Sequence, residues 1–192
     1  MGRADVFDII RARLRAEPAR PPSEGLAEAS VAALLSPGAG DGLDVLLIRR
    51  SERPGDPWSG QMALPGGRRD PADADALDTA VREAFEETGV RLAKDRLLGE
   101  LEVVEPMTPS AAPLLVRPFV FALAAKPRLR PSGEVALHLW VGLDALAGSS
   151  GPAEVSFQGR RRQVPAFFAA GHVVWGITYR ILSRLLSVVP PR

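Results

Sequence analysis

Three glutamates stand close together near the end of one short segment, LDTAVREAFEETGV, which covers residues 77–90. They are Glu83, Glu86 and Glu87. At about 100° per residue, an α-helix would place them within an arc of about 100° on one side. Clustered carboxylates with no His or Cys nearby offer hard oxygen ligands, which suit Mg²⁺ or Mn²⁺ better than zinc or copper. The segment therefore indicates either a divalent metal site or an acidic face exposed to solvent.

The spacing of these charges bears on that choice. Glu83 and Glu87 form a repulsive i, i+4 pair, and Glu86 and Glu87 fall in the last turn, where the helix dipole disfavours an anion by about 0.3 to 1 kcal/mol each. An exposed face explains Asp78, Arg82 and Glu86, because these residues of alternating charge stand four positions apart and attract one another. It does not explain the repulsive pair, and a local rule broken in this way points to a functional site.

The elements around the glutamates are predicted from periodicity and turn residues. Residues 77–88 predict a helix that ends at Gly89, the residue type preferred just past a helix end. Its inward face is expected to carry Leu77, Val81, Ala84, Phe85 and Thr88. Residues 50–76 are dense in Gly, Pro, Asp and Arg, which predicts a long functional loop. Within it, Gly66 and Gly67 permit positive φ and the close approach of a ligand or metal.

The rest of the chain predicts a mixed α/β or α+β layer fold. An N-terminal helix is expected to begin at an Asp5 N-cap and to stop at Pro18. Pro118 should place its strand at a sheet edge or bulge. A closing helix from about Trp175 should bury Ile177, Ile181, Leu182 and Leu185. The other predicted parts are a hairpin (30–35 with 43–48), strands (97–104, 114–124, 134–141, 160–164), a helical turn (143–146) and a flexible link (148–152).

Composition narrows the class of protein. The 192 residues fit one domain, and 24 Lys plus Arg against 23 Asp plus Glu give a formal charge of +1. No global field therefore attracts nucleic acid or anionic lipid, and we expect neither partner. No apolar run reaches the ~20 residues of a membrane span. The chain has no Cys, which excludes disulfides and cysteine nucleophiles and suits a cytoplasmic protein. His138 and His172 are far apart and give no support to a Ser-His-Asp site.

The string PGG and, fifteen positions on from Gly67, the string REAFEETGV resemble the Nudix hydrolase signature G-x5-E-x7-R-E-U-x-E-E-x-G-U, where U is a bulky apolar residue. Its fixed positions are occupied by Gly67, Arg82, Glu83, Glu86, Glu87, Gly89 and Val90, with a small Ala84 at an apolar position. The sequence differs from the signature in two features. The interval from Gly67 to Arg82 is one residue longer, and the first Glu, which commonly orders the loop, is replaced by Asp73 or Ala74.

The longer interval is similar to that of the coenzyme A diphosphatase branch of this superfamily. LLIRRSERPGDPWSGQMALPGG also resembles that branch, with Ile48 where Thr is usual and Leu64 where Phe is usual, and VVWGITYRILSRLL resembles its closing helix. The resemblance implies a Nudix fold, a mixed sheet between helices. Residues 1–25 would form the N-terminal helix and linker, and 26–192 the Nudix hydrolase domain.

The implied activity is metal-dependent hydrolysis of a nucleoside diphosphate linked to another group. The first expectation is coenzyme A or acyl-coenzyme A, cleaved to 4′-phosphopantetheine and adenosine 3′,5′-bisphosphate. Alternatives are ADP-ribose, a dinucleotide or an oxidised nucleoside triphosphate, because fold does not set substrate. A non-catalytic binding module is a third reading, but its usual mark, loss of signature carboxylates, is missing here. The partner is thus a small nucleotide, and the sequence leaves a homodimer open.

The resemblance also implies roles for individual residues. Glu83 and Glu87 would bind Mg²⁺ or Mn²⁺, with the Gly67 carbonyl and Glu86 completing or supporting the site. Arg82 would orient Glu86. Glu134, which follows the turn RPSG, is the candidate general base, although an exposed loop Glu is often only solvated. Trp58 is expected either to stack on a base or to pack the loop. Candidates for binding substrate are the glycines Gly66 and Gly67 and, as guanidinium forks for phosphates, Arg49, Arg50 and Arg53 or residues 160–162.

Overall fold

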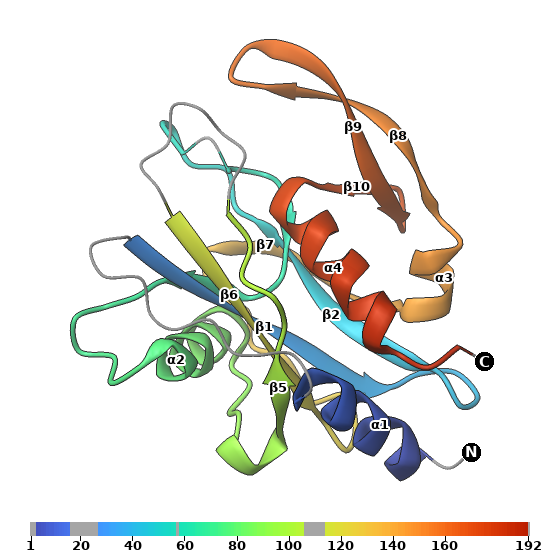
Figure 1. Ribbon diagram of the computed structural model, residues 1–192. Helices are drawn as coiled ribbons and strands as arrows, with labels where there is room; N and C mark the ends of the chain where they lie inside the picture. The colour runs from blue at the N-terminus through green and yellow to red at the C-terminus, as the bar shows by residue number, and fades with distance from the viewer. Residues whose placement is uncertain (1–2, 16–26, 57, 106–113, 192) are drawn as a thin grey trace.

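The computed structural model describes residues 3–15, 27–56, 58–105 and 114–191. Within these ranges a seven-stranded mixed sheet forms the centre of the protein, in the order β3-β2-β1-β6-β5, with β4 paired to β1 and β7 paired to β2 (Figure 1). β1 and β6 run parallel, and the other pairs are antiparallel. The strands are β1 (Ala27–Pro37), β2 (Leu43–Arg50), β3 (Met62–Ala63), β4 (Gly66–Arg68), β5 (Leu97–Glu100), β6 (Leu114–Ala122) and β7 (Val135–Gly142).

A three-stranded antiparallel sheet and the helices complete the fold. The small sheet contains β8 (Ser150–Phe157), β9 (Arg160–Ala169) and β10 (His172–Trp175), in the order β10-β9-β8. The helices are α1 (Arg3–Arg15), α2 (Ala76–Thr88), the 3₁₀ turn η1 (Lys94–Arg96), α3 (Leu143–Ala147) and α4 (Gly176–Val188). The predicted mixed α/β class is therefore confirmed, together with the hairpin of β1 and β2 and the helical turn that is now α3.

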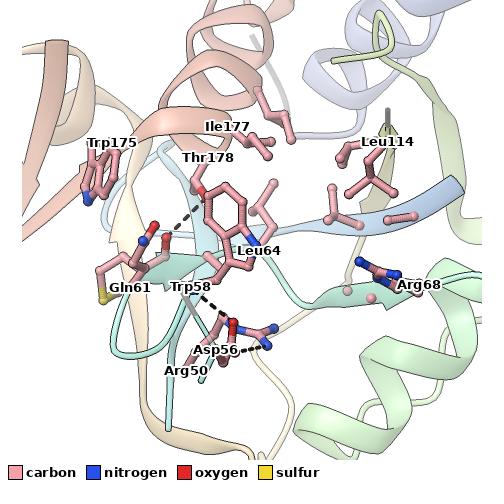
Figure 2. Close-up of a pocket in the computed structure, with 18 of the residues that line it drawn as sticks. Arg50, Asp56, Trp58, Gln61, Leu64, Arg68, Leu114, Trp175, Ile177 and Thr178 are labelled. Atoms are coloured by element: carbon pink, nitrogen blue, oxygen red, sulfur yellow. Dashed lines mark hydrogen bonds and ion pairs between the residues drawn. The ribbon is translucent and has the colours of Figure 1, made fainter. Parts of the chain in front are cut away.

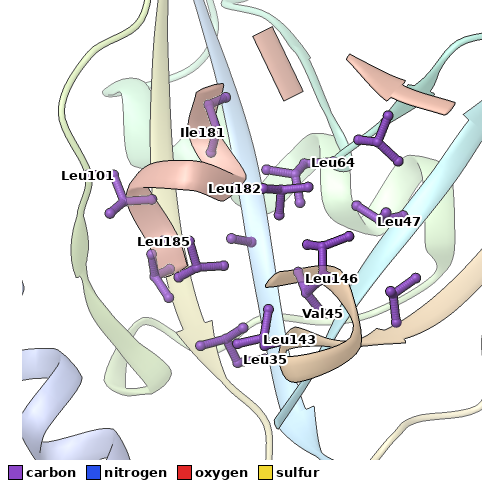
Figure 3. Close-up of a cluster of buried hydrophobic side chains, with 14 of the residues drawn as sticks. Leu35, Val45, Leu47, Leu64, Leu101, Leu143, Leu146, Ile181, Leu182 and Leu185 are labelled. Atoms are coloured by element: carbon purple, nitrogen blue, oxygen red, sulfur yellow. The ribbon is translucent and has the colours of Figure 1, made fainter. Parts of the chain in front are cut away.

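Alternation along β1 explains why helices cover both faces of the central sheet. Ala32 and Leu34 belong to a buried cluster with α2, while Ala33 and Leu35 belong to a second cluster with α1, α3 and α4. Successive side chains of a strand point to opposite faces, so this buried strand must be apolar at nearly every position. Figure 3 shows the second cluster, where leucines of α4 such as Leu182 lie against β1 and β2. The sheet between helices predicted from the Nudix resemblance is confirmed.

The N-terminal helix packs on this second cluster. Ile10 and Leu14 are buried there, and α1 lies along β5 and α4. Helix α1 begins at Arg3, so the predicted N-cap at Asp5 is wrong: Asp5 lies inside the helix. The predicted stop at Pro18 and the linker that follows it lie outside the described residues, and the division at residue 25 stays a prediction.

Two predictions about strands are also wrong. The strand with Pro118 lies inside the sheet, between β1 and β5, and Pro118 stands opposite Val31. The sheet accommodates the proline because β5 pairs only with Phe119 and the residues after it, while Pro118 itself supplies its carbonyl, which accepts from the Leu101 N–H at 2.9 Å. The expected flexible link at 148–152 instead enters β8, where Ser150 pairs with Phe167 of β9. Long-range pairing overrides the local turn signal of its Gly and Pro.

The closing helix agrees with its prediction. Helix α4 starts at Gly176, directly after Trp175, and buries Ile181, Leu182 and Leu185, with Ile177 partly buried. Among the helices of the described residues, none is both long enough and apolar enough to cross a bilayer.

Candidate active site

The ends of α2 are fixed by the residues that the sequence places there. The Asp75 carboxylate accepts a hydrogen bond of 2.8 Å from the Asp78 backbone N–H, which caps the first turn. At the other end Gly89 adopts a φ of 74°, and its N–H donates to the Phe85 carbonyl at 2.8 Å. The predicted helix and its glycine stop are confirmed, and the glutamates lie in the last two turns.

The buried face of α2 agrees with the predicted one except at Phe85: Ala84 and Thr88 are buried, and Leu77 and Val81 pack partly buried against the same cluster. Phe85 is 40% exposed and packs under the Arg91 guanidinium, whereas Glu87 is only 3% exposed. The buried neighbours of Glu87 on the helix are small residues, Ala76, Ala80, Ala84 and Thr88. Small side chains let the helix approach β1 closely, which rotates the bulkier Phe85 outward. The result is a carboxylate in the interior, where an unpaired charge is costly.

The diglycine bend lies directly against this helix. The Gly66 N–H donates to Glu87 Oε2 at 2.8 Å. Gly66 has a φ of 159°, and a Cβ at this position would collide with the Ser30 carbonyl oxygen of β1. A Cβ on Gly67 would come within 2.5 Å of the Glu83 carboxylate. Gly66 therefore requires glycine because the backbone of β1 approaches it, whereas a side chain at position 67 would displace the Glu83 carboxylate.

Arg82 connects the glutamates to the loop. Its Nη1 donates to Glu83 Oε1 at 2.8 Å and to Glu86 Oε2 at 2.9 Å, so it orients Glu86 as predicted and Glu83 as well. Its Nη2 also donates to the Arg68 carbonyl at 3.1 Å, which ties the guanidinium to β4. The side chain is thus held on several sides, as expected of a residue that positions others.

Asp73 fills the role left open by the missing signature glutamate. It accepts from Arg82 Nε at 2.9 Å and from Arg82 Nη2 at 3.0 Å, and its Oδ2 also accepts from the Thr79 hydroxyl and the Asp70 N–H. The Arg82 hydrogen bonds outweigh burial and hold the pKa of Asp73 far below its ordinary value. Of the two positions that replace the glutamate, the structure selects Asp73 over Ala74, which has no acidic side chain.

The charges of the buried glutamates are incompletely neutralised. Burial raises the pKa of Glu87 to about 7, because the Gly66 N–H only partly offsets it and the charges of Glu83 and Glu134 raise it further. Burial also raises the pKa of Glu83, against the opposing effect of Arg82. Both carboxylates would gain from a nearby cation.

A divalent ion fits the chemistry of these donors. They are hard oxygens of the kind that Mg²⁺ and Mn²⁺ prefer, and within the described part of the chain the buried Glu87 carboxylate has one hydrogen-bond donor, the Gly66 N–H. Among the described residues, no group of three His, Cys, Asp or Glu side chains stands ready to hold a metal ion. Arg82 accounts for part of this, since it draws Glu83 and Glu86 toward itself. Direct ligation by all three glutamates would require Glu86 to turn away from Arg82.

Other predicted residues lie across from the bend, near the start of the long loop. Arg53 Nη2 donates to Glu134 Oε1 at 2.8 Å, and the Ser51 N–H donates to the Glu134 carbonyl at 2.8 Å. The charge of Arg50 lowers the pKa of Glu87, whereas the charge of Glu134 raises it, so both groups lie within electrostatic reach of that carboxylate. The structure therefore brings Glu134, Arg50 and Arg53 toward the glutamates.

A cavity of about 620 Å³ opens beside the diglycine bend (Figure 2). Gly66, Gly67 and Arg50 line it, but the three glutamates do not, so they lie behind the bend. Much of the wall is apolar and comes from β1, β6 and α4. Lining residues that the sequence analysis missed are Asp56, Arg68, Leu114, Gln158, Trp175 and Thr178. Of these, Asp56 stands in LLIRRSERPGDPWSGQMALPGG, and Trp175 and Thr178 stand in VVWGITYRILSRLL, the two strings that resemble the coenzyme A diphosphatase branch.

Trp58 lines the cavity and also packs the loop. Its ring centroid lies 5.4 Å from that of Phe157, which in turn lies 5.5 Å from Trp175. Its backbone N–H donates to Asp56 Oδ1 at 2.9 Å, and Arg50 Nη2 donates to Asp56 Oδ2 at 3.1 Å. Trp58 therefore has the packing role that was one of its two predicted roles, and its contacts hold the loop over the cavity.

The remaining predicted residues lie apart from the carboxylates. Arg49 lines neither the bend nor the first cavity, and residues 160–162 are exposed on β9. His138 lies exposed on β7 and His172 lies on β10, so each has the place in a strand or near the closing helix that the sequence suggested.

Comparison with known proteins agrees with this fold and site. A family model for the NUDIX domain matches residues 27–167. The "Uncharacterized Nudix hydrolase NudL" of Photorhabdus laumondii is 35% identical over 134 residues, which cover 68% of this chain and 70% of that protein. The human "Mitochondrial coenzyme A diphosphatase NUDT8" is 32% identical over 186 residues, which cover 94% of this chain and 73% of that protein.

Other matches are shorter or more distant. An uncharacterized Schizosaccharomyces pombe protein, C14C4.10c, is 44% identical over 90 residues, but the match spans only 27% of its length. The crystal structure of a MutT/nudix family protein from Enterococcus faecalis superimposes with a TM-score of 0.60 at 16% identity, and covers 98% of this chain and 74% of its own. The domain match, the relatives and the carboxylate helix agree: the protein belongs to the Nudix hydrolase family.

Proposed function

We propose that this Nudix hydrolase cleaves the diphosphate bond of coenzyme A or an acyl derivative. The observation that carries the proposal is the contact of Glu83 and Glu87 with the Gly66–Gly67 bend, at the edge of a large cavity. The printed activity of the human relative, coenzyme A diphosphatase, supports the choice of substrate. The longer loop, which resembles the same branch, supports it independently.

Each residue has a role in this reaction. Glu83, Glu87, Glu86 and the Gly67 carbonyl would hold Mg²⁺ or Mn²⁺. When bound, the cation neutralises the diphosphate and lowers the pKa of a coordinated water. Arg82, held by Asp73, orients Glu83 and Glu86.

The residues proposed to act on the substrate and on the attacking water lie across the site from the diglycine bend. Arg50 lines the cavity, and Asp56 holds its Nη2 at 3.1 Å, so its guanidinium is placed to contact a phosphate there. Arg53 holds Glu134, which would accept the proton of the attacking water. Attack of the water oxygen on one phosphorus breaks the bridging P–O bond, and the second phosphate leaves with the bonding electrons.

A panel of substrates tests the proposal. The protein with Mg²⁺ or Mn²⁺ is incubated with coenzyme A, acetyl-coenzyme A, ADP-ribose, dinucleotides and nucleoside triphosphates, and the products are identified by mass spectrometry. We expect 4′-phosphopantetheine and adenosine 3′,5′-bisphosphate from coenzyme A. Selective cleavage of ADP-ribose, a dinucleotide or a triphosphate would replace coenzyme A as the substrate. Binding without any cleavage would favour a non-catalytic module.

Variants connect the activity to the site. Glu83→Gln and Glu87→Gln should each lower kcat by about 10² or more, as loss of a group that stabilises transition-state charge does, while circular dichroism stays unchanged. Glu154→Gln on β8 is a matched control, because Glu154 is exposed and pairs only with Arg161 in the described contacts. Unchanged rates in both site variants would remove these glutamates from the mechanism. The cytoplasmic location and the homodimer stay predictions.

A further inference from the structure

A second cavity, of about 470 Å³, adjoins the first one. Gln61, Met62, Gln158 and Trp175 line both cavities, so the two form one continuous depression. The diglycine bend stands at the first cavity only, which leaves the second cavity farther from the scissile bond. A substrate arm that starts at the bend and fills the first cavity can therefore continue into the second.

The second cavity is rich in hydrogen-bond donors. Among the described residues that line it, none is Asp or Glu, while the side chains with N–H or O–H donors include Arg49, Gln61, Ser156, Gln158, His172 and Trp175. Arg49 is fixed in the wall, because its Nε donates to the Gly60 carbonyl at 3.2 Å and its Nη2 to the exposed Glu52 at 3.3 Å. No described contact is made by Arg49 Nη1. A cavity of this composition suits an anion.

The turn between β8 and β9 supplies a second observation. Gln158 and Gly159 are the two central residues of this turn, since Phe157 pairs with Arg160. Both have positive φ, 51° for Gln158 and 71° for Gly159. Such turns favour Gly, Asn or Asp at these positions, and a long Gln is strained there. Ala170 has the same conformation in the turn between β9 and β10, so what distinguishes Gln158 is its place in the lining of both cavities.

We propose that the second cavity binds an anionic group of the substrate other than the diphosphate, with Arg49, Gln158 and His172 as the residues that determine specificity. The exposed Arg160, Arg161 and Arg162 directly follow the turn and add positive charge beside it. This inference rests on the hydrolase function proposed above. In a coenzyme A derivative the anion has two sources, a phosphomonoester on the ribose or a carboxylate at the end of an acyl chain.

Pairs of substrates that differ by one anionic group test the inference and separate its two sources. The first pair is coenzyme A and 3′-dephospho-coenzyme A, and the second is succinyl-coenzyme A and butyryl-coenzyme A. We expect one pair to show at least about a tenfold preference in kcat/KM for the member with the extra anion, the size of a single charged contact. Arg49→Gln should abolish most of that preference. Equal kcat/KM within both pairs would overturn the inference.

Two further variants show whether a lost preference reflects the second cavity or merely misfolding or a change in net charge. Gln158→Gly removes the amide but relieves the positive φ, so it should fold at least as well and still lose part of the preference. Arg184→Gln removes one positive charge from an exposed side chain of α4 that lines neither cavity, and its preference should equal that of the unmodified protein. If Arg49→Gln and Gln158→Gly both keep the full preference, the second cavity is not the site that recognises the anion.

Binding measured without turnover separates this inference from the proposed function. Calorimetric titrations compare adenosine 3′,5′-bisphosphate with 5′-AMP, and succinyl-coenzyme A with butyryl-coenzyme A, in the presence of EDTA. If no diphosphate in the panel is hydrolysed, the proposed function fails. The proposal that the second cavity binds an anion is still supported when the ligand with the extra anion has the higher affinity and Arg49→Gln removes that difference in affinity. Equal affinity within both ligand pairs overturns it.

Discussion

The Asp73 carboxylate receives two hydrogen bonds from the Arg82 guanidinium, at 2.9 and 3.0 Å, and so connects the long loop to the helix of the glutamates. Its side chain is only 6% exposed. The pair is positioned so that the remaining amino group of Arg82 reaches Glu83 and Glu86. Loop order and carboxylate orientation therefore depend on the same ion pair.

Replacing this carboxylate should affect both stability and rate. Asp73→Asn removes one of the three carboxylates that pair with Arg82 and weakens two hydrogen bonds to its guanidinium, a change that typically costs about 1.5 to 3 kcal/mol. We expect a lower free energy of unfolding in urea and a lower kcat, because Arg82 no longer holds Glu83 and Glu86 in place. Asp41→Asn, in the exposed turn of the first hairpin, should change neither quantity. A stable Asp73→Asn protein with full activity would contradict the role assigned to Asp73.

Gly67 offers a test of the close approach between backbone and carboxylate. Gly67→Ala places a Cβ within 2.5 Å of the Glu83 carboxylate, and this side chain must then move. We expect a loss of kcat/KM of about 10²-fold, typical of a small displacement at a reacting centre. Gly148→Ala is the matched control, because its Cβ would meet only ordinary contacts of 3.6 Å or more. The measurement is steady-state kinetics, and equal rates for the two variants would refute the prediction.

Glu134 can be tested as the general base. Glu134→Gln keeps the shape of the side chain, so its hydrogen bond from Arg53 should persist while its ability to accept a proton is lost. We expect kcat to fall by about 10² to 10⁴ with little change in KM. Glu102→Gln, at another exposed ion pair, serves as the control. A normal kcat at every pH would assign proton transfer to another group.

Glu87 should make the metal-free protein depend on pH in an unusual direction. Its pKa is about 7 in the folded protein and 4.5 for the free side chain, so the folded state binds the proton more tightly. Its contribution to stability is complete below pH 4.5 and is lost as pH rises through 7, by roughly 3 kcal/mol.

Urea denaturation in EDTA between pH 4.5 and 8 measures this effect. Glu87→Gln should flatten the profile in that range, and Mg²⁺ should restore stability at pH 8 to the unmodified protein but less to the variant. Asp73 acts in the opposite sense, because its lowered pKa makes the protein lose stability only in more acidic solution. A profile that is already flat in EDTA would show that Glu87 is charged at neutral pH without a cation.

Local signals explain what the sequence could predict of the site. The α2 helix, its stop at Gly89 and the contact of Arg82 with Glu86 depend on neighbours within a few positions, and all three are confirmed. Phe85 was wrongly predicted on the buried face of α2, and Glu87 was missed there, because alanines, which are weak signals of burial, set the rotation of the helix. The partnership of Asp73 with Arg82 also escaped prediction, since it depends on how the longer loop folds back.

Residues of the cavities were harder to predict because they come from distant parts of the chain. Gln158 and Trp175 reach the first cavity only through the pairing of β8, β9 and β10, and β8 itself carries Gly and Pro where a link was expected. Arg49 and Arg50 adjoin at the end of β2, where the pairing with β7 shifts register, so regular alternation does not predict which way each side chain points. The structure gives them to different cavities.

The two tryptophans that pack against Phe157 can report the binding of a ligand through their own fluorescence. Of the three tryptophans in the chain, Trp58 and Trp175 line the first cavity. Trp140 lies on β7, with the Lys126 ammonium over its ring. Arrival of a nucleotide changes the surroundings of two indoles at once and leaves the third as an internal reference. Intrinsic fluorescence can therefore follow occupancy in real time, with no label attached and before any bond is broken.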